Sequence, residues 1–329
     1  MHTLIIGANG LIGRPLARLF AAAAHGTLTL ADRTTPTPPP NATIPVTCRT
    51  GDIRDSTFLR TLLEGTDCII HLAALLAAET EADPAQGHAV NVAALFQLLT
   101  LCETLPAPPK FLYASSIAAF GGPLPEAVTD DQPRTPQSTY GTHKAIAELL
   151  IDDATRRRHI DGRVLRLPII LVRNGPNTAT VSDRIAALIR EPLAGRDITC
   201  GLHPDTLMPV ASAQYAATAF HRLAAIGAAR LRPARSMNLP CLSLTATGLA
   251  AAVARAPAPN ATPKGRITWT PDPALQSLID TWPRRLASEA ATTLALTTPE
   301  TIDDIIARYT AETHGSAPAH KPGSNQKPT

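Results

Sequence analysis

Apolar residues in the first half of the chain alternate between short runs with β-branched members and longer stretches rich in Ala and Leu. The short runs predict strands at residues 2–6, 27–31, 46–53, 67–72, 110–115 and 163–167. The longer stretches predict helices at residues 11–24, 56–63, 90–104 and 138–158. Strands that alternate with helices indicate a parallel sheet with helices on both faces. The predicted fold class is therefore α/β, with a doubly wound parallel sheet.

The pattern loosens after residue 170, where we expect a smaller α/β substrate lobe. Its predicted helices cover residues 181–190, 212–229, 242–255 and 298–313, with a short strand at 236–239. We therefore assign residues 1–170 to the first domain and residues 171–313 mainly to the lobe, with some elements that return to the first domain. Residues 314–329 are rich in Gly, Pro, Ser and Lys and are expected to form a disordered tail.

Residues 34–45 interrupt the regular pattern, with four prolines between positions 36 and 40. This density of proline excludes an internal strand or helix and predicts a stiff surface loop. A Pro-rich recognition site is the alternative interpretation.

Composition narrows the class of protein. Hydrophobic residues make up 44% and charged residues 17%, so the chain can bury a sizeable core. A net charge of +3 gives no electrostatic argument for nucleic acid or an anionic membrane. The longest apolar run, 68–78, is too short to span a membrane, and the first residues lack the pattern of a signal peptide. The five cysteines show no metal-ligand spacing, so we expect reduced thiols, a cytoplasmic protein and no metal site.

A glycine loop follows the first predicted strand and opens the first helix, in the sequence GANGLIG. The first glycine permits a sharp turn, the second lets the backbone approach a pyrophosphate, and the third lets the helix pack close to the strand. The helix N-terminus adds free N–H groups and a partial positive charge. The candidate cofactor-binding residues of this loop are Gly7, Asn9, Gly10, Leu11, Ile12 and Gly13.

Acidic and small residues end the next strands. Asp32 lies 19 residues after the last glycine of the loop, where a carboxylate binds ribose hydroxyls and repels a 2′-phosphate. This favours NAD over NADP, although Arg33 is able to pair with a phosphate. Asp52, before Ile53, is a candidate for the adenine amino group, or alternatively a cap of the following helix. At the end of the fourth strand, Leu72, Ala73 and Ala74 would let the cofactor lie against the backbone, and we interpret His71 as structural.

Tyr140-Gly-Thr-His-Lys144 carries the candidate chemistry. Residues four apart on a helix share one face, so the Lys144 ammonium is expected to favour the Tyr140 phenolate and lower its pKa. Tyr140 then accepts a proton from a substrate hydroxyl while hydride leaves. Ser116, after the fifth strand, is expected to hydrogen-bond the reacting oxygen. His143 is a weaker candidate base. A Tyr and a Lys four residues apart often occur by chance. The glycine loop and Asp32 in the same chain make a catalytic role for this pair more probable than chance.

The motifs GANGLIG, GDI, HLAA, SSIAAFG and YGTHK together resemble the extended short-chain dehydrogenase/reductase family, also called the NAD-dependent epimerase/dehydratase family. The resemblance covers about residues 1–240 and implies a Rossmann-type fold, bound NAD, and Ser116, Tyr140 and Lys144 as catalytic residues. It also implies that Pro168 and Ile169 lie near the nicotinamide. In this family the helices at 90–104 and 138–158 usually form a four-helix dimer interface, so a homodimer is expected.

The segments FGGPLPEAVTDD and RLPIILVRNGPN resemble a branch of the family that oxidises the 2-hydroxyl of a four-carbon sugar acid with NAD. A substrate carboxylate needs a cation or several donors, and Arg173, Asn177 and Arg190 are the candidates. Each has a surface or turn role as the alternative. Two other functions remain open: a nucleotide-sugar epimerase that keeps NAD bound, and a regulator that senses NAD without catalysis.

Overall fold

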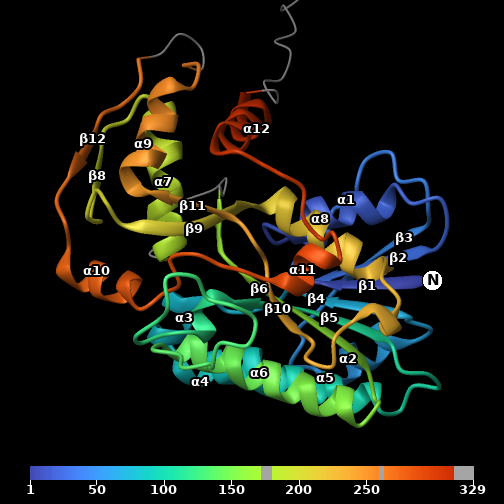
Figure 1. Cartoon of the computed structure of the whole chain (residues 1–329). Helices are drawn as coiled ribbons and strands as arrows, with labels where there is room; N and C mark the ends of the chain where they lie inside the picture. Colours follow the sequence, from blue (N-terminus) through green and yellow to red (C-terminus); the bar gives the residue numbers. More distant parts are fainter. Residues whose placement is uncertain (172–179, 259–262, 315–329) are drawn as a thin grey trace, which may run out of the picture.

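The computed structural model describes residues 1–171, 180–258 and 263–314. Its centre is a seven-stranded sheet in the order β10-β6-β5-β4-β1-β2-β3 (Figure 1), in which every neighbouring pair is parallel. The strands are β1 (His2–Ile6), β2 (Thr27–Asp32), β3 (Val46–Thr50), β4 (Cys68–His71), β5 (Lys110–Ser116), β6 (Asp161–Leu167) and β10 (Ser236–Asn238). The predicted α/β class with a doubly wound parallel sheet is confirmed.

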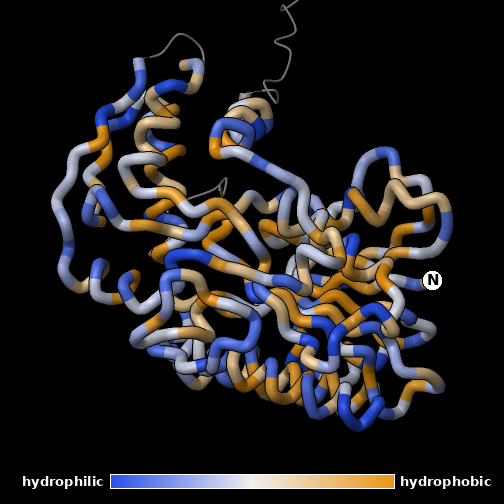
Figure 2. The backbone as a smooth tube through the Cα atoms, in the orientation of Figure 1, coloured by the Kyte–Doolittle hydropathy of each residue, from blue (hydrophilic) through white to orange (hydrophobic). Residues whose placement is uncertain are grey.

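Helices cover both faces of this sheet, because successive strand residues point to opposite sides. Ile5 packs into one apolar cluster, whereas Leu4 and Ile6 pack into another. Helices α1 (Gly13–Ala21), α8 (Ala213–Ala225) and α11 (Glu289–Thr293) cover the first face. Helices α2 (Ser56–Leu63), α5 (Ala94–Cys102) and α6 (Thr139–Arg156) cover the second face. In Figure 2 the apolar residues concentrate in the strands between these two helical layers.

The second half of the chain has its own apolar core, which includes Ile189, Val210 and Leu249. Its strands are β7 (Ile169–Leu171), β9 (Leu207–Ser212) and β11 (Leu242–Thr245) in one sheet, and β8 (Ile198–Cys200) and β12 (Ile267–Trp269) in another. Its helices are α7 (Val181–Leu193), α9 (Ala246–Arg255), α10 (Pro273–Asp280) and α12 (Ile302–His314). Between these elements, α8, β10 and α11 return to the large sheet. The predicted tail lies, from residue 315 onward, outside the described residues.

Some predicted boundaries are wrong, for identifiable reasons. The helix expected at 90–104 starts earlier, because Asp83 caps α4 (Pro84–His88), which continues through a π-helical turn, η1 (Ala89–Ala93), into α5. The helix expected at 242–255 begins as β11, because these residues pair with β9. The short elements α3 (Ala77–Ala82) and the 3₁₀ turns η2 (Ile117–Ala119) and η3 (Ala228–Arg230) complete the structure. Residues 34–45 form neither helix nor strand, as predicted.

The thiols, metal-ligand groups and helices of the described residues can be compared with the expectations from composition. All five cysteines are free thiols. Within the described ranges no group of His, Cys, Asp and Glu side chains is arranged to hold a metal ion. Likewise, no helix there has the length and apolar character needed to cross a bilayer.

Candidate active site

The glycine loop lies where the strand order reverses, between β1 and β4, at the edge where all the parallel strands end. This is the position at which open α/β sheets bind ligands. Gly7 has φ +89°, and a Cβ there would lie 2.7 Å from the backbone nitrogen of Ala73. A Cβ on Gly13 would lie 2.3 Å from the carbonyl oxygen of Gly7. Backbone therefore packs so tightly on both sides of the loop that only glycine fits.

Gly10 differs from its two neighbours in this loop. The single atom near a Cβ placed there is the Gly7 oxygen, at 3.1 Å, so its outer side faces open space. Helix α1 starts without a side-chain cap, and the N–H groups at a helix start bind phosphate well. The exposed backbone around Gly10 and Leu11 therefore fits a pyrophosphate, as the sequence predicted for a dinucleotide.

Asp32, at the end of β2, is held beside the loop. Its carboxylate accepts hydrogen bonds from the backbone N–H of Asn9 at 2.9 Å and of Thr34 at 3.4 Å. The Asn9 side chain in turn donates to Thr34 and to the Thr35 carbonyl. A fixed carboxylate next to a phosphate-binding loop matches an adenosine ribose, so these residues fit NAD.

Asp52 does not cap the following helix; its side chain pairs with that of Arg54. It pairs with Arg54 at 2.6 Å, and the side-chain hydrogen bond from Arg54 lowers the pKa of the Asp52 carboxyl. Asp55 caps α2 by accepting from the backbone N–H groups of Thr57 and Phe58. The capping alternative for Asp52 is therefore wrong, and its proposed contact with adenine stays a prediction.

The segment after β4 is fixed from behind. Asn91, buried in the π-helical turn, exchanges two hydrogen bonds with the backbone of Leu75. This holds residues 72–74 against the glycine loop. His71 is buried at the end of β4, and burial lowers its pKa to about 3. Its Nδ1 has no hydrogen-bond partner among the described residues. A neutral, enclosed imidazole fits the structural role that we expected.

Ser116 and Tyr140 meet at the ends of β5 and α6. Ser138 caps α6 by accepting from the backbone N–H of Gly141. A Cβ on Gly141 would lie 2.0 Å from the carbonyl oxygen of Ala118, so glycine lets the first turn of α6 contact η2. This contact brings the Tyr140 side chain within hydrogen-bonding range of the Ser116 side chain.

Lys144 lies one turn along α6, with its Nζ over the Tyr140 ring. Its Nζ donates to the Tyr113 hydroxyl at 3.1 Å and to the Ala114 carbonyl at 2.7 Å, and lies 5.5 Å from the Tyr140 ring centroid. Burial lowers the pKa of Lys144 to about 7. Burial also raises the pKa of Tyr140 to about 12, opposed by the Ser116 hydrogen bond. The expected lowering of the Tyr140 pKa is therefore wrong for this structure, because desolvation of the buried phenol outweighs the lowering by Ser116.

A buried ionic cluster behind the site escaped the sequence analysis. Glu148, with no exposed surface, accepts from Ser115 at 2.5 Å and from Arg166 at 2.8 Å. Arg134 donates to the same carboxylate at 2.9 Å. The cluster joins α6 to the ends of β5 and β6. The signal was a carboxylate four residues after Lys144, on the same helical face.

Of the three candidate substrate-binding residues, Arg190 is the one that lies in the described part of the chain. Arg190, on α7, is buried and pairs with Asp183 and Glu191, both at 3.1 Å, which occupies its charge inside the protein. Pro168 and Ile169 are buried where the chain passes from β6 to β7. Arg173 and Asn177 lie outside the described residues.

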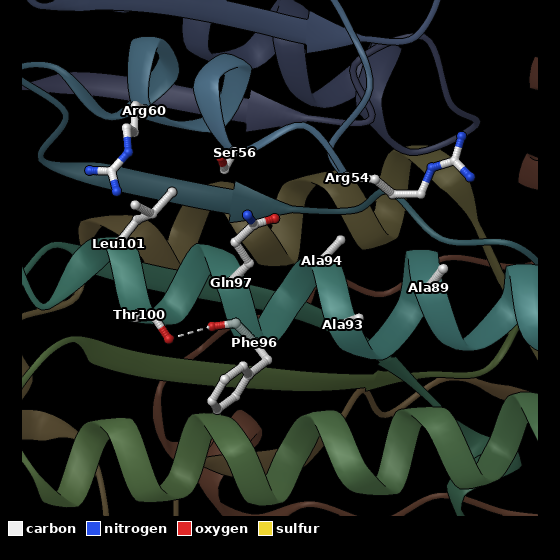
Figure 3. A pocket seen from close by; sticks show the side chains of 10 residues that line it. All are labelled: Arg54, Ser56, Arg60, Ala89, Ala93, Ala94, Phe96, Gln97, Thr100 and Leu101. Atoms are coloured by element: carbon white, nitrogen blue, oxygen red, sulfur yellow. Dashed lines mark hydrogen bonds between the residues drawn. The ribbon is translucent and has the colours of Figure 1, made fainter.

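A groove of about 590 Å³ lies elsewhere, between α2 and α5 (Figure 3). None of the candidate site residues lines it. It is lined by Arg54, Ser56, Arg60, Ala89, Ala93, Ala94, Phe96, Gln97, Thr100 and Leu101.

Known proteins resemble this chain over most of its length. The model of the NAD dependent epimerase/dehydratase family matches residues 3–225. D-erythronate dehydrogenase from Cupriavidus necator is 38% identical, over 94% of this chain and 98% of its own. The enzyme of that name from Haemophilus influenzae is 31% identical over 94% and 98%. A crystal structure of a nucleoside-diphosphate-sugar epimerase from Agrobacterium tumefaciens has a TM-score of 0.86 at 29% identity, over 96% of this chain and 95% of its own.

Proposed function

The chain belongs to the NAD-dependent epimerase/dehydratase family, and from this premise we propose that it oxidises the 2-hydroxyl of a small sugar acid such as D-erythronate to the 2-oxo acid. The observation that carries the proposal is the meeting of Ser116, Tyr140 and Lys144 at the sheet edge that also holds the glycine loop. The choice of substrate rests on similarity to the two D-erythronate dehydrogenases.

In the proposed reaction Tyr140 accepts the proton of the substrate 2-hydroxyl, and the hydrogen on carbon 2 leaves with both electrons as hydride. When bound, NAD supplies the hydride acceptor and, in its oxidised form, a positive charge in the site. Ser116 orients the reacting oxygen and favours the Tyr140 phenolate through its hydrogen bond. Lys144 adds a second positive charge when protonated. The substrate becomes a 2-oxo acid, and one proton is released.

The substrate carboxylate needs its own partner. We propose Arg173 and Asn177 for this role, since a planar guanidinium binds a carboxylate through two parallel hydrogen bonds. Arg190 remains a third candidate, but its pairs with Asp183 and Glu191 must first be exchanged for the substrate. This makes it the weakest of the three.

The test is NADH formation from a panel of aldonic acids with three to six carbons, followed by absorbance. We expect turnover with erythronate-like acids, and Tyr140→Phe to lower kcat by about 100-fold or more, because the variant lacks the phenol oxygen that accepts the proton. Tyr215→Phe is the matched control, since its hydroxyl donates to the Pro240 carbonyl outside the site. Full activity in Tyr140→Phe would contradict the proposed proton transfer.

A second candidate is a nucleotide-sugar epimerase, favoured by the similarity to the Agrobacterium tumefaciens structure. Such an enzyme would interconvert uridine diphosphate sugars without net NADH formation. The same preparation distinguishes the two functions: epimerised sugar nucleotide with no turnover of any aldonic acid would replace the dehydrogenase proposal.

We further propose that the enzyme acts in the cytoplasm as a homodimer. The free thiols of all five cysteines suit a reducing compartment. Exposed apolar residues on α5 and α6 support the dimer.

A further inference from the structure

The environment of Lys144 contains a group that the family motifs do not include. Nζ donates to the Tyr113 hydroxyl at 3.1 Å and lies 4.6 Å from the centroid of the Tyr113 ring. Tyr113 is almost completely buried, with 2% of its surface exposed. In the part of the chain that the structure describes, its hydroxyl has Lys144 as its hydrogen-bond partner. A polar group buried this deeply is expensive unless it is paired, so the contact is a specific one.

The Tyr113 ring has a second aromatic contact in the adjacent strand β4. It stacks on His71 with 5.8 Å between the ring centroids. Its strand, β5, continues within three residues to Ser116. One strand therefore carries both the residue that contacts Tyr140 and the residue that contacts Lys144.

The hydrogen bonds of Lys144 to β5 leave one of its N–H donors for a group in the active site. An ammonium has three N–H donors. Two are taken by Tyr113 and by the Ala114 carbonyl, both from β5. The third remains for Tyr140 or for a bound ligand. The ionisable groups that face or influence this amine are Tyr113 of β5, His71 of β4, and Tyr140, His143 and Glu148 of α6.

We propose that Tyr113 is a positioning residue for the dehydrogenase reaction: by accepting a hydrogen bond from Lys144, it keeps the amine protonated and directed toward Tyr140. The inference rests on the proposed function. Tyr113 itself stays neutral, because burial raises its pKa well above the usual value. It therefore acts as an acceptor and does not compete with Tyr140 as a base.

The Tyr113→Phe variant removes the oxygen and keeps the ring. Loss of this acceptor removes more hydrogen-bond stabilisation from the protonated amine than from the neutral amine. The pKa of Lys144 should therefore fall by about one pH unit. The phenolate of Tyr140 then forms at higher pH. We expect the acid limb of the kcat profile to move up by as much as about one pH unit, with kcat near pH 7 reduced up to about ten-fold.

The pH dependence separates positioning from general damage. At high pH Lys144 is neutral in both proteins, so the ratio of the two kcat values should approach one. KM for NAD and for the sugar acid should change less than about two-fold, because Tyr113 acts through Lys144. Tyr215→Phe, which loses a part-buried, hydrogen-bonded hydroxyl outside the site, should leave the profile in place. A uniform loss of kcat at every pH would overturn the proposal.

A second measurement needs neither substrate nor NAD. The chain has only five lysines, so carbon-13 NMR of labelled lysine side chains can follow Lys144, assigned by the loss of its signal in Lys144→Met. The Lys144 titration should move to lower pH in Tyr113→Phe, and an unchanged titration would refute the inference. If this variant does not fold, Tyr113→Leu gives the same comparison, since it also lacks the acceptor. Wild-type protein that oxidises no sugar acid would overturn the proposed function alone, because the NMR comparison stands without it.

Discussion

Burial dominates the chemistry of single residues in this site. The four-residue spacing predicted that Tyr140 and Lys144 share a face of a helix, and both lie on α6. The spacing did not reveal that each is desolvated, which raises the pKa of Tyr140 to about 12 and lowers that of Lys144 to about 7. Nor did it reveal Tyr113 and Glu148, whose roles depend on contacts between β5 and α6. Residue types were therefore predictable, and their protonation states were not.

The buried amine has a consequence for stability. Folded Lys144 titrates at about pH 7, below its unfolded value of 10.5. Between these values the unfolded chain binds more protons, so stability should rise with pH, by up to about 1.4 kcal/mol per unit from this residue. Lys144→Met should lack this rise. Urea unfolding from about pH 7 to about pH 10 tests it as the difference between the two proteins. Lys264→Met, at a partly exposed lysine, is the control, and a pH-independent difference for Lys144→Met would contradict the expectation.

At the scale of elements, the glycine loop and α1 act as one unit, and two similar substitutions should separate its two functions. Gly13→Ala places a Cβ 2.3 Å from the Gly7 oxygen and 2.7 Å from the Ala8 oxygen, so backbone must shift. We expect a loss of about 1–3 kcal/mol of stability and of most NAD affinity. Gly10→Ala meets only the Gly7 oxygen, at 3.1 Å, and should fold like wild type while still binding NAD less tightly.

Calorimetric titration with NAD and thermal unfolding measure these two effects separately. The structure requires a lower melting temperature for Gly13→Ala than for Gly10→Ala. Equal melting temperatures would show that the loop is not packed as described. Unchanged NAD affinity in Gly10→Ala would show that the pyrophosphate does not approach this glycine.

The elements that were predicted well are those with the strongest local pattern. The helix Ser56–Leu63 has the expected bounds, and the apolar strands around β4 fall within a few residues of expectation. Short strands of the second half, such as β8 and β12, escaped prediction because three residues carry too little periodicity and their pairing is long-range. β11 was taken for the start of a helix for the same reason.

For the whole molecule, the distribution of exposed apolar side chains supports the proposed assembly. Two large apolar side chains, Phe96 and Leu149, are more than half exposed and lie on α5 and α6. These helices pack side by side on one face of the sheet (Figure 1). Figure 3 shows Phe96 on the side of α5 toward α6, whereas Arg60 and Ser56 lie across the groove on α2. The outer surface of the pair is thus apolar where a second copy would complete a four-helix interface.

Charged substitutions on this surface should separate the two copies, whatever the substrate of the enzyme is. Phe96→Glu combined with Leu149→Glu places two charges on a surface that an isologous contact repeats, so each interface would bury four carboxylates. We expect wild-type protein to sediment as a dimer at micromolar concentration and the double variant as a folded monomer with unchanged circular dichroism. Ala251→Glu, on the exposed side of α9, adds a charge elsewhere and should leave the dimer intact. Because α6 also carries Tyr140 and Lys144, loss of the partner should lower activity if the interface stabilises that helix. A wild-type monomer at this concentration would refute the assembly and leave the site within one chain unaffected.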